Sequence, residues 1–114
     1  MGYYSAIALA IHKGDEHQLA KRIGCLNNGV FNQVCKLFES ADKSYSRSNE
    51  DYVVYYWNSV KWYENIFIEV DFIMDFIKRL KYPYDFIRIG EDFDDTTIHN
   101  EAQVIEAHRI ISIS

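Results

Sequence analysis

The sequence predicts one α+β domain spanning residues 1–114, with an antiparallel sheet and helices packed on one face, as in the ferredoxin-like plait. The first observation is the order of segments, which reads strand, helix in two pieces, strand, helix, strand, strand. The second is that 114 residues, 48% of them hydrophobic, suit one domain with a real core. Right-handed crossovers favour this topology. The alternative is another α+β sandwich that ends in a long C-terminal hairpin.

The first half of the chain begins with a strand at residues 3–11, whose alternation places alanines on one face. A turn at residues 12–14 precedes a helix. We expect Asp15 to cap that helix, with Gln18 completing a capping box, and Gly24 to end it.

A second helix follows a break at residues 27–29 and runs to about Ala41, because apolar residues recur there at helical spacing. Residues 42–51 are polar and are the best loop candidate in the chain. Residues 52–57 form a dense β-branched and aromatic run, which predicts a second strand.

The strongest helix prediction covers residues 66–80. The apolar residues there keep a 4-3-4-3 spacing, and Pro83 prevents continuation. The stripe expected to face the core consists of Ile66, Val70, Ile73, Ile77 and Leu80. Successive side chains of residues 84–90 fall on opposite sides of an extended chain, which predicts a third strand. We expect residues 96–99 to extend a hairpin and residues 103–113 to form a last strand.

The formal charge is −5, and it is unevenly placed. Residues 1–84 are balanced, whereas residues 85–114 carry seven acids and two bases. This balance argues against a general nucleic-acid or membrane-surface binder, which needs a basic face. No apolar run reaches the roughly 20 residues of a membrane-spanning helix, and the start lacks a signal-peptide pattern. We therefore expect a cytoplasmic protein.

Motifs for catalysis, metals or cofactors are missing from the sequence. No GxSxG, phosphate-binding loop or GxGxxG motif occurs, so we expect no enzyme, no catalytic residues and no cofactor. Cys25 and Cys35 lack zinc-site spacing and are expected to be buried thiols. The histidines lack it as well and are expected to be solvated groups at strand ends: His12, His17, His99 and His108.

An acidic run of Glu91, Asp92, Asp94 and Asp95 allows three interpretations. It can be a solvated turn, or a Ca²⁺ or Mg²⁺ site, although Phe93 interrupts the calcium-loop pattern and no glycine follows. It can also be a patch that faces a protein partner, since clustered carboxylates can occupy a basic groove that otherwise holds phosphates.

Aromatic residues make up 16% of the chain and concentrate at residues 52–63. They are either core residues or part of an interface, for example of a homodimer, because Tyr and Trp bring large rigid area and a polar tip. The candidate anchors are Tyr55, Trp57, Trp62 and Tyr63. Base stacking on strand aromatics, as in RNA-binding plaits, is a further alternative. The acidic turn and the missing RNP1 pattern oppose it.

The chain resembles small proteins carried by bacteriophages and other mobile elements. The resemblance is carried by the start YYSAIALAI and by two blocks, YWNSVKWY at residues 56–63 and FIRIGED at residues 86–92. This resemblance implies a phage accessory protein with a plait-like α+β fold that neutralises a host system by binding. It supplies no catalytic residues.

The first hypothesis is therefore a non-enzymatic counter-defence inhibitor that blocks a host protein, such as a defence nuclease or effector that binds nucleic acid. The acidic run provides the charged contact and the four aromatic residues provide anchors. The second hypothesis is a protein that sequesters a small ligand, for example a nucleotide signal, by stacking at a subunit interface. A third is a self-assembling structural protein.

Overall fold

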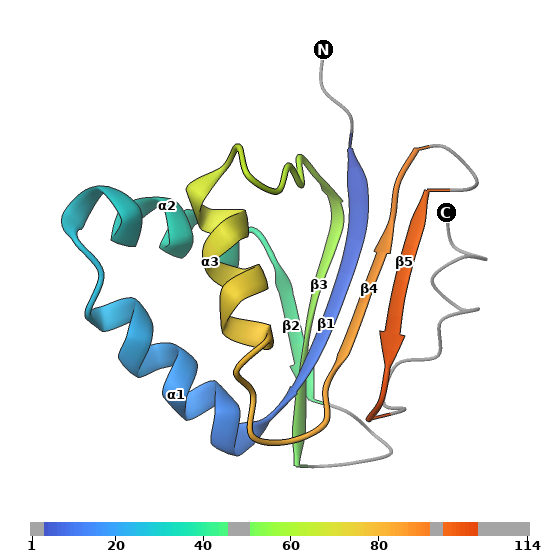
Figure 1. Ribbon diagram of the computed structural model, residues 1–114, viewed down its shortest axis with the longest axis horizontal. Coiled ribbons are helices and arrows are strands. Elements are labelled where there is room, and N and C mark those ends of the chain that lie inside the picture. Colours follow the sequence, from blue (N-terminus) through green and yellow to red (C-terminus); the bar gives the residue numbers. More distant parts are fainter. Residues whose placement is uncertain (1–3, 46–50, 92–94, 103–114) are drawn as a thin grey trace.

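The computed structural model describes residues 4–45, 51–91 and 95–102, and in this part of the chain five strands form one antiparallel sheet in the order β2-β3-β1-β4-β5. Three helices pack on one face of that sheet (Figure 1). The elements are β1 (Ser5–His12), α1 (Lys13–Gly24), α2 (Asn28–Glu39), β2 (Asp42–Tyr45), β3 (Tyr52–Val60), α3 (Ile68–Ile77), β4 (Asp85–Ile89) and β5 (Thr96–Asn100).

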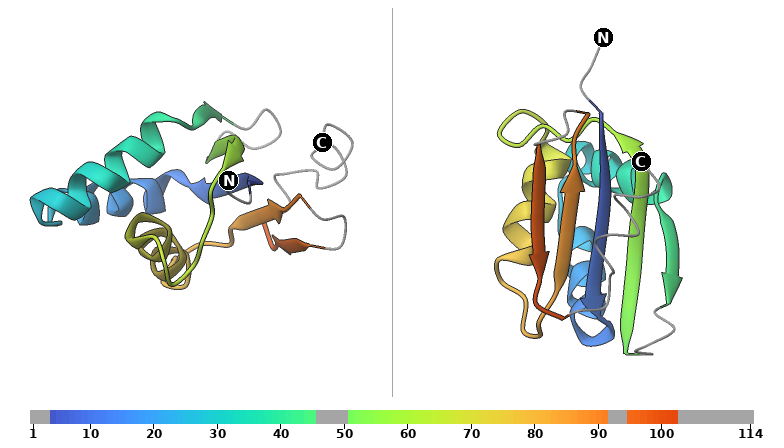
Figure 2. Two further views of the ribbon diagram at one scale, coloured as in Figure 1. Left: turned by 90° about the horizontal axis from the view of Figure 1, so that it is seen from above. Right: turned by 90° about the vertical axis from the view of Figure 1, so that its right-hand side faces the viewer.

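The α+β class, the antiparallel sheet and the placement of the helices on one face are confirmed. β1 lies in the centre, where Ala8 is opposite Tyr56 of β3 on one side and Ile87 of β4 on the other. The right-hand view of Figure 2 shows the five strands with the helices behind them. The ferredoxin-like plait is not confirmed, because β5 adds a fifth strand beyond β4 and the strand order differs from that of a four-stranded plait.

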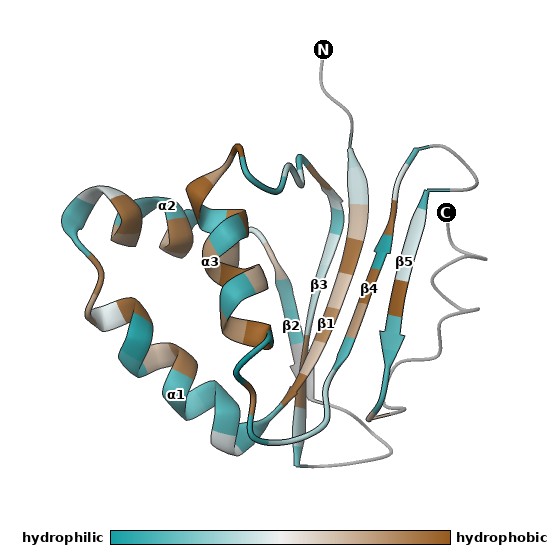
Figure 3. Ribbon diagram, in the orientation of Figure 1, coloured by the Kyte–Doolittle hydropathy of each residue, from teal (hydrophilic) through white to brown (hydrophobic). Residues whose placement is uncertain are grey.

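The main core lies between the helices and the sheet. β1 contributes Ile7, Leu9 and Ile11, which its alternation places on the helix side. The helix α3 contributes Val70 and Ile73 to the same core. Figure 3 shows the hydrophobic colour on β1 and α3 and the hydrophilic colour along much of α1. The helix predicted most strongly from the sequence thus contributes directly to this core.

A second apolar cluster occupies the opposite face of the sheet, which none of the described helices covers. It joins the small residues Ala8 and Ala10 to Ile87, and Ala102 packs against it. The backbone N–H of Ala102 donates to the buried carboxylate of Asp85 at 2.9 Å. The described chain therefore ends against this second face.

The start of α1 differs from the expectation. The cap is His12, whose Nδ1 accepts the backbone N–H of Gly14 at 3.0 Å, so strand and helix join without a turn. Asp15 lies inside the helix and its carboxylate instead accepts the backbone N–H groups of Lys81 and Tyr82. The predicted capping box was wrong because two backbone donors after α3 bind the carboxylate instead. Asn27 does cap α2, accepting from Val30 at 3.0 Å.

Two further predictions are corrected. Asp42–Tyr45, expected as part of a loop, form β2, since an edge strand tolerates polar residues on its solvent side. Ile66 is 72% exposed, because α3 begins only at Ile68. The helix also ends at Ile77, before the predicted limit of residue 80. The predicted strand at residues 103–113 lies outside the described residues.

The cysteine prediction was also wrong. Cys25 follows the last residue of α1 and is exposed, while Cys35 on α2 is half-buried. Both thiols are free, as expected, but neither is fully buried, so the error concerns their burial alone.

Candidate functional site

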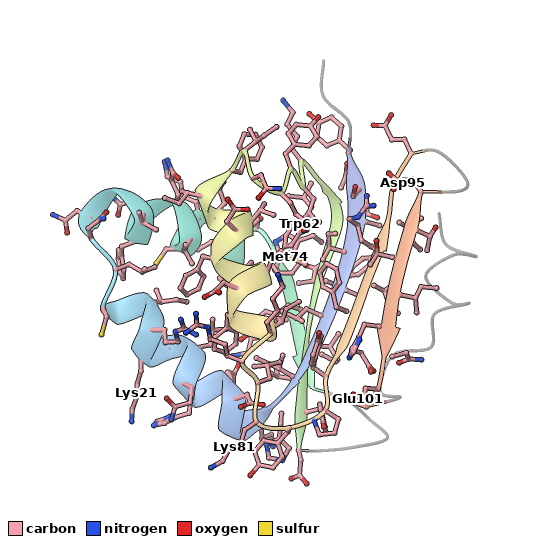
Figure 4. The ribbon with its side chains drawn as sticks, viewed as in Figure 1. Lys21, Trp62, Met74, Lys81, Asp95 and Glu101 are labelled. Carbon is pink, nitrogen blue, oxygen red and sulfur yellow. The ribbon has the colours of Figure 1, made fainter. Side chains whose placement is uncertain are left out.

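The acidic run is partly engaged within the chain. The guanidinium of Arg88 donates to both carboxylate oxygens of Asp95, at 2.5 and 3.1 Å. The carboxylate of Glu91 accepts the backbone N–H of Tyr4 at 2.8 Å. Figure 4 labels Asp95 beside the start of β5. Asp92 and Asp94 lie outside the described residues. Both described carboxylates of the run therefore help to hold the ends of β1, β4 and β5 together.

Three of the four predicted aromatic anchors belong to the core. Tyr55, Trp57 and Trp62 are 7%, 2% and 5% exposed. The indole N–H of Trp57 donates to the carbonyl of Leu37 at 2.8 Å, so this ring joins β3 to the end of α2. Tyr63 is partly exposed. Of the four predicted anchors, Tyr55, Trp57 and Trp62 thus offer almost no surface to a partner.

A pocket of about 610 Å³ opens between α1, α2 and the edge formed by β2 and β3. Its apolar wall comes from both helices: Leu19, Ala20 and Ile23 of α1 and Cys35 and Phe38 of α2. Leu19 and Ile23 share one face of α1 with Glu16, because residues three, four and seven apart lie on the same side of a helix. The pocket therefore combines an apolar wall with one carboxylate from the same helix.

The polar groups of the pocket converge on Glu16. Its Oε2 accepts the hydroxyl hydrogen of Tyr55 at 2.5 Å and lies 3.0 Å from Nζ of Lys43. Lys43 reaches it because it is directly opposite Tyr55 in the β2–β3 pairing. The same Nζ lies 5.8 Å from the centroid of the Tyr55 ring. Three elements thus place a carboxylate, a phenol and an ammonium together at the pocket, and Lys13, His17 and Glu39 add further polar lining.

A second hollow, of about 480 Å³, lies between α1 and the end of α3. Two of the charged groups that line it, Arg22 and Arg79, are paired with Asp75 of α3. Asp75 bridges Arg22 at 3.5 Å and Arg79 at 3.4 Å, and the Arg22 guanidinium lies over the ring of Phe76. We interpret this hollow as the contact between the two helices, since its polar groups serve that contact.

Two of the histidines, expected from the sequence as solvated groups, take part in ring contacts. His12 stacks on Tyr82 with centroids 3.8 Å apart, and His99 stacks on Tyr84 at 4.2 Å. His17 is exposed, and His108 lies outside the described residues. Among residues 4–45, 51–91 and 95–102, no three His, Cys, Asp or Glu side chains come together as a metal site requires.

The site around Glu16 was not predicted from the sequence. A signal existed in the spacing of Glu16, Leu19 and Ile23 on one helix face. The contribution of Lys43 could not be found, because residues 42–51 read as a loop and the pairing with Tyr55 depends on β2.

No protein-family model, no curated protein and no solved structure gives a significant match to this chain. The resemblance to phage accessory proteins therefore stays a prediction. Within the described part of the chain, no helix has both the length and the apolar character needed to cross a membrane.

Proposed function

We propose that this chain is a non-enzymatic binding protein that takes up a small molecule in the pocket between α1, α2 and the β2–β3 edge. The observation that carries the proposal is the pocket itself. Its volume of about 610 Å³ suits a small ligand, since such pockets measure about 300–1,000 Å³. Its lining also has the composition that is usual for small-molecule sites, namely an apolar wall with a few convergent polar groups.

The polar groups of the pocket support binding because they are already oriented. Tyr55 is almost fully buried, and its hydroxyl fixes one oxygen of Glu16. A carboxylate held in this way loses little freedom when a ligand arrives, which lowers the cost of association. These groups can orient a ligand without taking part in a reaction.

The test fills the pocket with a side chain. Ala20 lines the pocket and is exposed, so Ala20→Trp places an indole in it. The matched control is Lys21→Trp at the next position, whose side chain points away from α1 in Figure 4 and does not line the pocket. Native mass spectrometry of the purified proteins then detects co-purified compounds, and an NMR fragment screen detects added ones.

We expect the wild-type protein and Lys21→Trp to bind compounds that Ala20→Trp does not bind. The pocket proposal is wrong if no compound shifts the amide signals of Glu16, Leu19 and Lys43 in the wild-type protein. It is equally wrong if Ala20→Trp binds the same compounds with unchanged affinity.

The inhibitor hypothesis stays a second proposal, supported by one observation. The net charge of −5 falls entirely within residues 85–114, which suits a basic surface on a host protein. In this proposal the chain is a phage-type protein acting in the host cytoplasm, either alone or as a homodimer. Native mass spectrometry distinguishes the two proposals, because a co-purified host protein has a far larger mass than a small ligand.

The fold proposal accompanies both functions. We propose that the sheet is a ferredoxin-like plait extended by β5. The two crossovers support it, since α1 and α2 connect β1 to β2 across β3, and α3 connects β3 to β4 across β1.

A further inference from the structure

We infer that the ligand of this pocket is an organic cation, a protonated amine with an apolar body, and that Lys43 occupies the cation position while the pocket is empty. The inference rests on the proposed function, since it names the chemical class that the same pocket takes. It is carried by the arrangement of Glu16, Tyr55 and Lys43.

The cation position is defined by two groups that the fold holds in place. Glu16 is fixed by the Tyr55 hydroxyl at 2.5 Å, and the Tyr55 ring provides a π face beside it. The ammonium of Lys43 lies 3.0 Å from the carboxylate and 5.8 Å from the ring centroid. A carboxylate together with an aromatic face is the environment in which proteins bind ammonium groups.

Lys43 can leave this position at little cost. Its side chain is 46% exposed, and it belongs to the edge strand β2. Ion pairs of this exposed kind are weak because solvent screens them and a long side chain must be ordered. A ligand ammonium can therefore replace the Lys43 ammonium, and the charge of Glu16 remains compensated.

The surroundings favour a cation with an apolar body. Leu19, Ile23 and Phe38 form a wall that can hold a ring or an alkyl chain. Glu39 adds a second carboxylate to the lining. An anionic ligand held by Lys13 and Lys43 is the opposite case. An anion bound to the Lys43 ammonium comes close to the Glu16 carboxylate, which lies 3.0 Å from that ammonium, and the two negative charges repel each other.

The experiment uses two probes of similar size and opposite charge. 2-Phenylethylamine is protonated at pH 7, and 3-phenylpropionate is ionised, so both present a ring with one charge. Affinities come from NMR titration of the full-length protein. We expect the wild-type protein to bind the amine more tightly than the carboxylate.

Two substitutions should change the affinity for the amine in opposite directions. Lys43→Met removes the competing ammonium and keeps a similar stem, and should tighten amine binding by about two- to fivefold. Glu16→Gln removes the charge that pairs with the ligand and should weaken it by about tenfold or more. If Glu16→Gln proves unstable, Glu39→Gln, at an exposed position, should weaken binding by about twofold.

The result that overturns the inference is the reverse pattern. For an anionic ligand, Lys43→Met weakens binding of 3-phenylpropionate and Glu16→Gln strengthens it. The pocket proposal then survives while the cation inference fails. If neither probe shifts the pocket signals in the wild-type protein or in Lys43→Met, the cation inference fails, and the Ala20→Trp comparison decides the pocket proposal separately.

Discussion

Asp15, in the first turn of α1, accepts the backbone N–H of Tyr82 at 3.1 Å, although 67 residues separate the two in sequence. The other oxygen of the same carboxylate accepts the N–H of Lys81 at 3.2 Å. Asp15 is 5% exposed. One buried side chain thus ties the segment between α3 and β4 to the beginning of α1.

Replacing this carboxylate should lower the stability of the fold. Asp15→Ala removes the buried acceptor of two part-buried hydrogen bonds, so we expect a loss of about 1–3 kcal/mol in the free energy of unfolding. Urea unfolding measures it. Asp75→Ala is the matched control on a helix surface, where loss of the exposed ion pairs should cost at most about 1 kcal/mol. Equal losses for the two variants would contradict the role of Asp15.

The two tryptophans should respond differently to the same substitution. Trp57→Phe removes a buried hydrogen bond to Leu37 and leaves its carbonyl without that donor. The indole nitrogen of Trp62 is buried without a hydrogen-bond partner among the described residues, so Trp62→Phe removes volume but no such bond. We expect Trp57→Phe to cost about 1–2 kcal/mol more than Trp62→Phe. Thermal unfolding followed by circular dichroism makes the comparison, and the opposite order would refute this assignment.

Alkaline pH should destabilise the protein through Tyr52. Burial raises the pKa of Tyr52 above 10.0, and the negative charges of Asp85 and Asp15 raise it further. The phenol is neutral in both states below about pH 10, where its contribution is fully present. As the pH rises through the folded-state pKa, the unfolded chain binds fewer protons than the native one, so stability falls.

The substitution Tyr52→Phe isolates this effect. It removes the titrating phenol, and it also removes the hydrogen bond from Tyr52 to the carbonyl of Pro83 at 2.7 Å. We expect the variant to be less stable than wild type at pH 8 by about 0.5–1.5 kcal/mol. Its deficit should shrink between pH 10 and pH 12, as measured by urea unfolding. Burial also raises the pKa of Tyr84, with a further contribution from Glu101, so Tyr84→Phe should show the same trend.

Reversal of the acidic run should separate stability from partner binding. Asp95→Lys places an ammonium against the Arg88 guanidinium, so we expect it to lower stability by about 1 kcal/mol. The pair Asp92→Lys and Asp94→Lys leaves the Arg88–Asp95 contact in place. If the run contacts a host protein, this pair should slow association at low salt, measured by surface plasmon resonance on a captured partner. Unchanged association would exclude an electrostatic contact there.

Periodicity predicted the elements that face the core. The helix with Val70, Ile73 and Ile77 and the strand at residues 52–57 were both found, because burial of one face imposes a regular apolar spacing. The apolar stripe was overextended at Ile66, which lies before the helix begins. The spacing of apolar residues alone does not show at which residue a helix begins to face the core.

The parts that the sequence did not predict depend on tertiary contacts. Asp15 resembles a helix cap locally, yet its partners are backbone groups beyond α3. Lys43 lies in a polar segment with weak strand propensity and becomes a strand residue only by pairing opposite Tyr55. The polar end of the pocket depends on this pairing, so the spacing of Glu16, Leu19 and Ile23 along α1 could not reveal it alone.

The central position of β1 also determines when the molecule can fold. Among the described strands β1 leaves the ribosome first, but the partners of its Ala8 are Tyr56 of β3 and Ile87 of β4. The sheet therefore cannot close until at least residue 89 has been synthesised, and contacts between such distant segments make folding slow. During translation both edges of β1 therefore stay without their native partners until β3 and β4 have been synthesised.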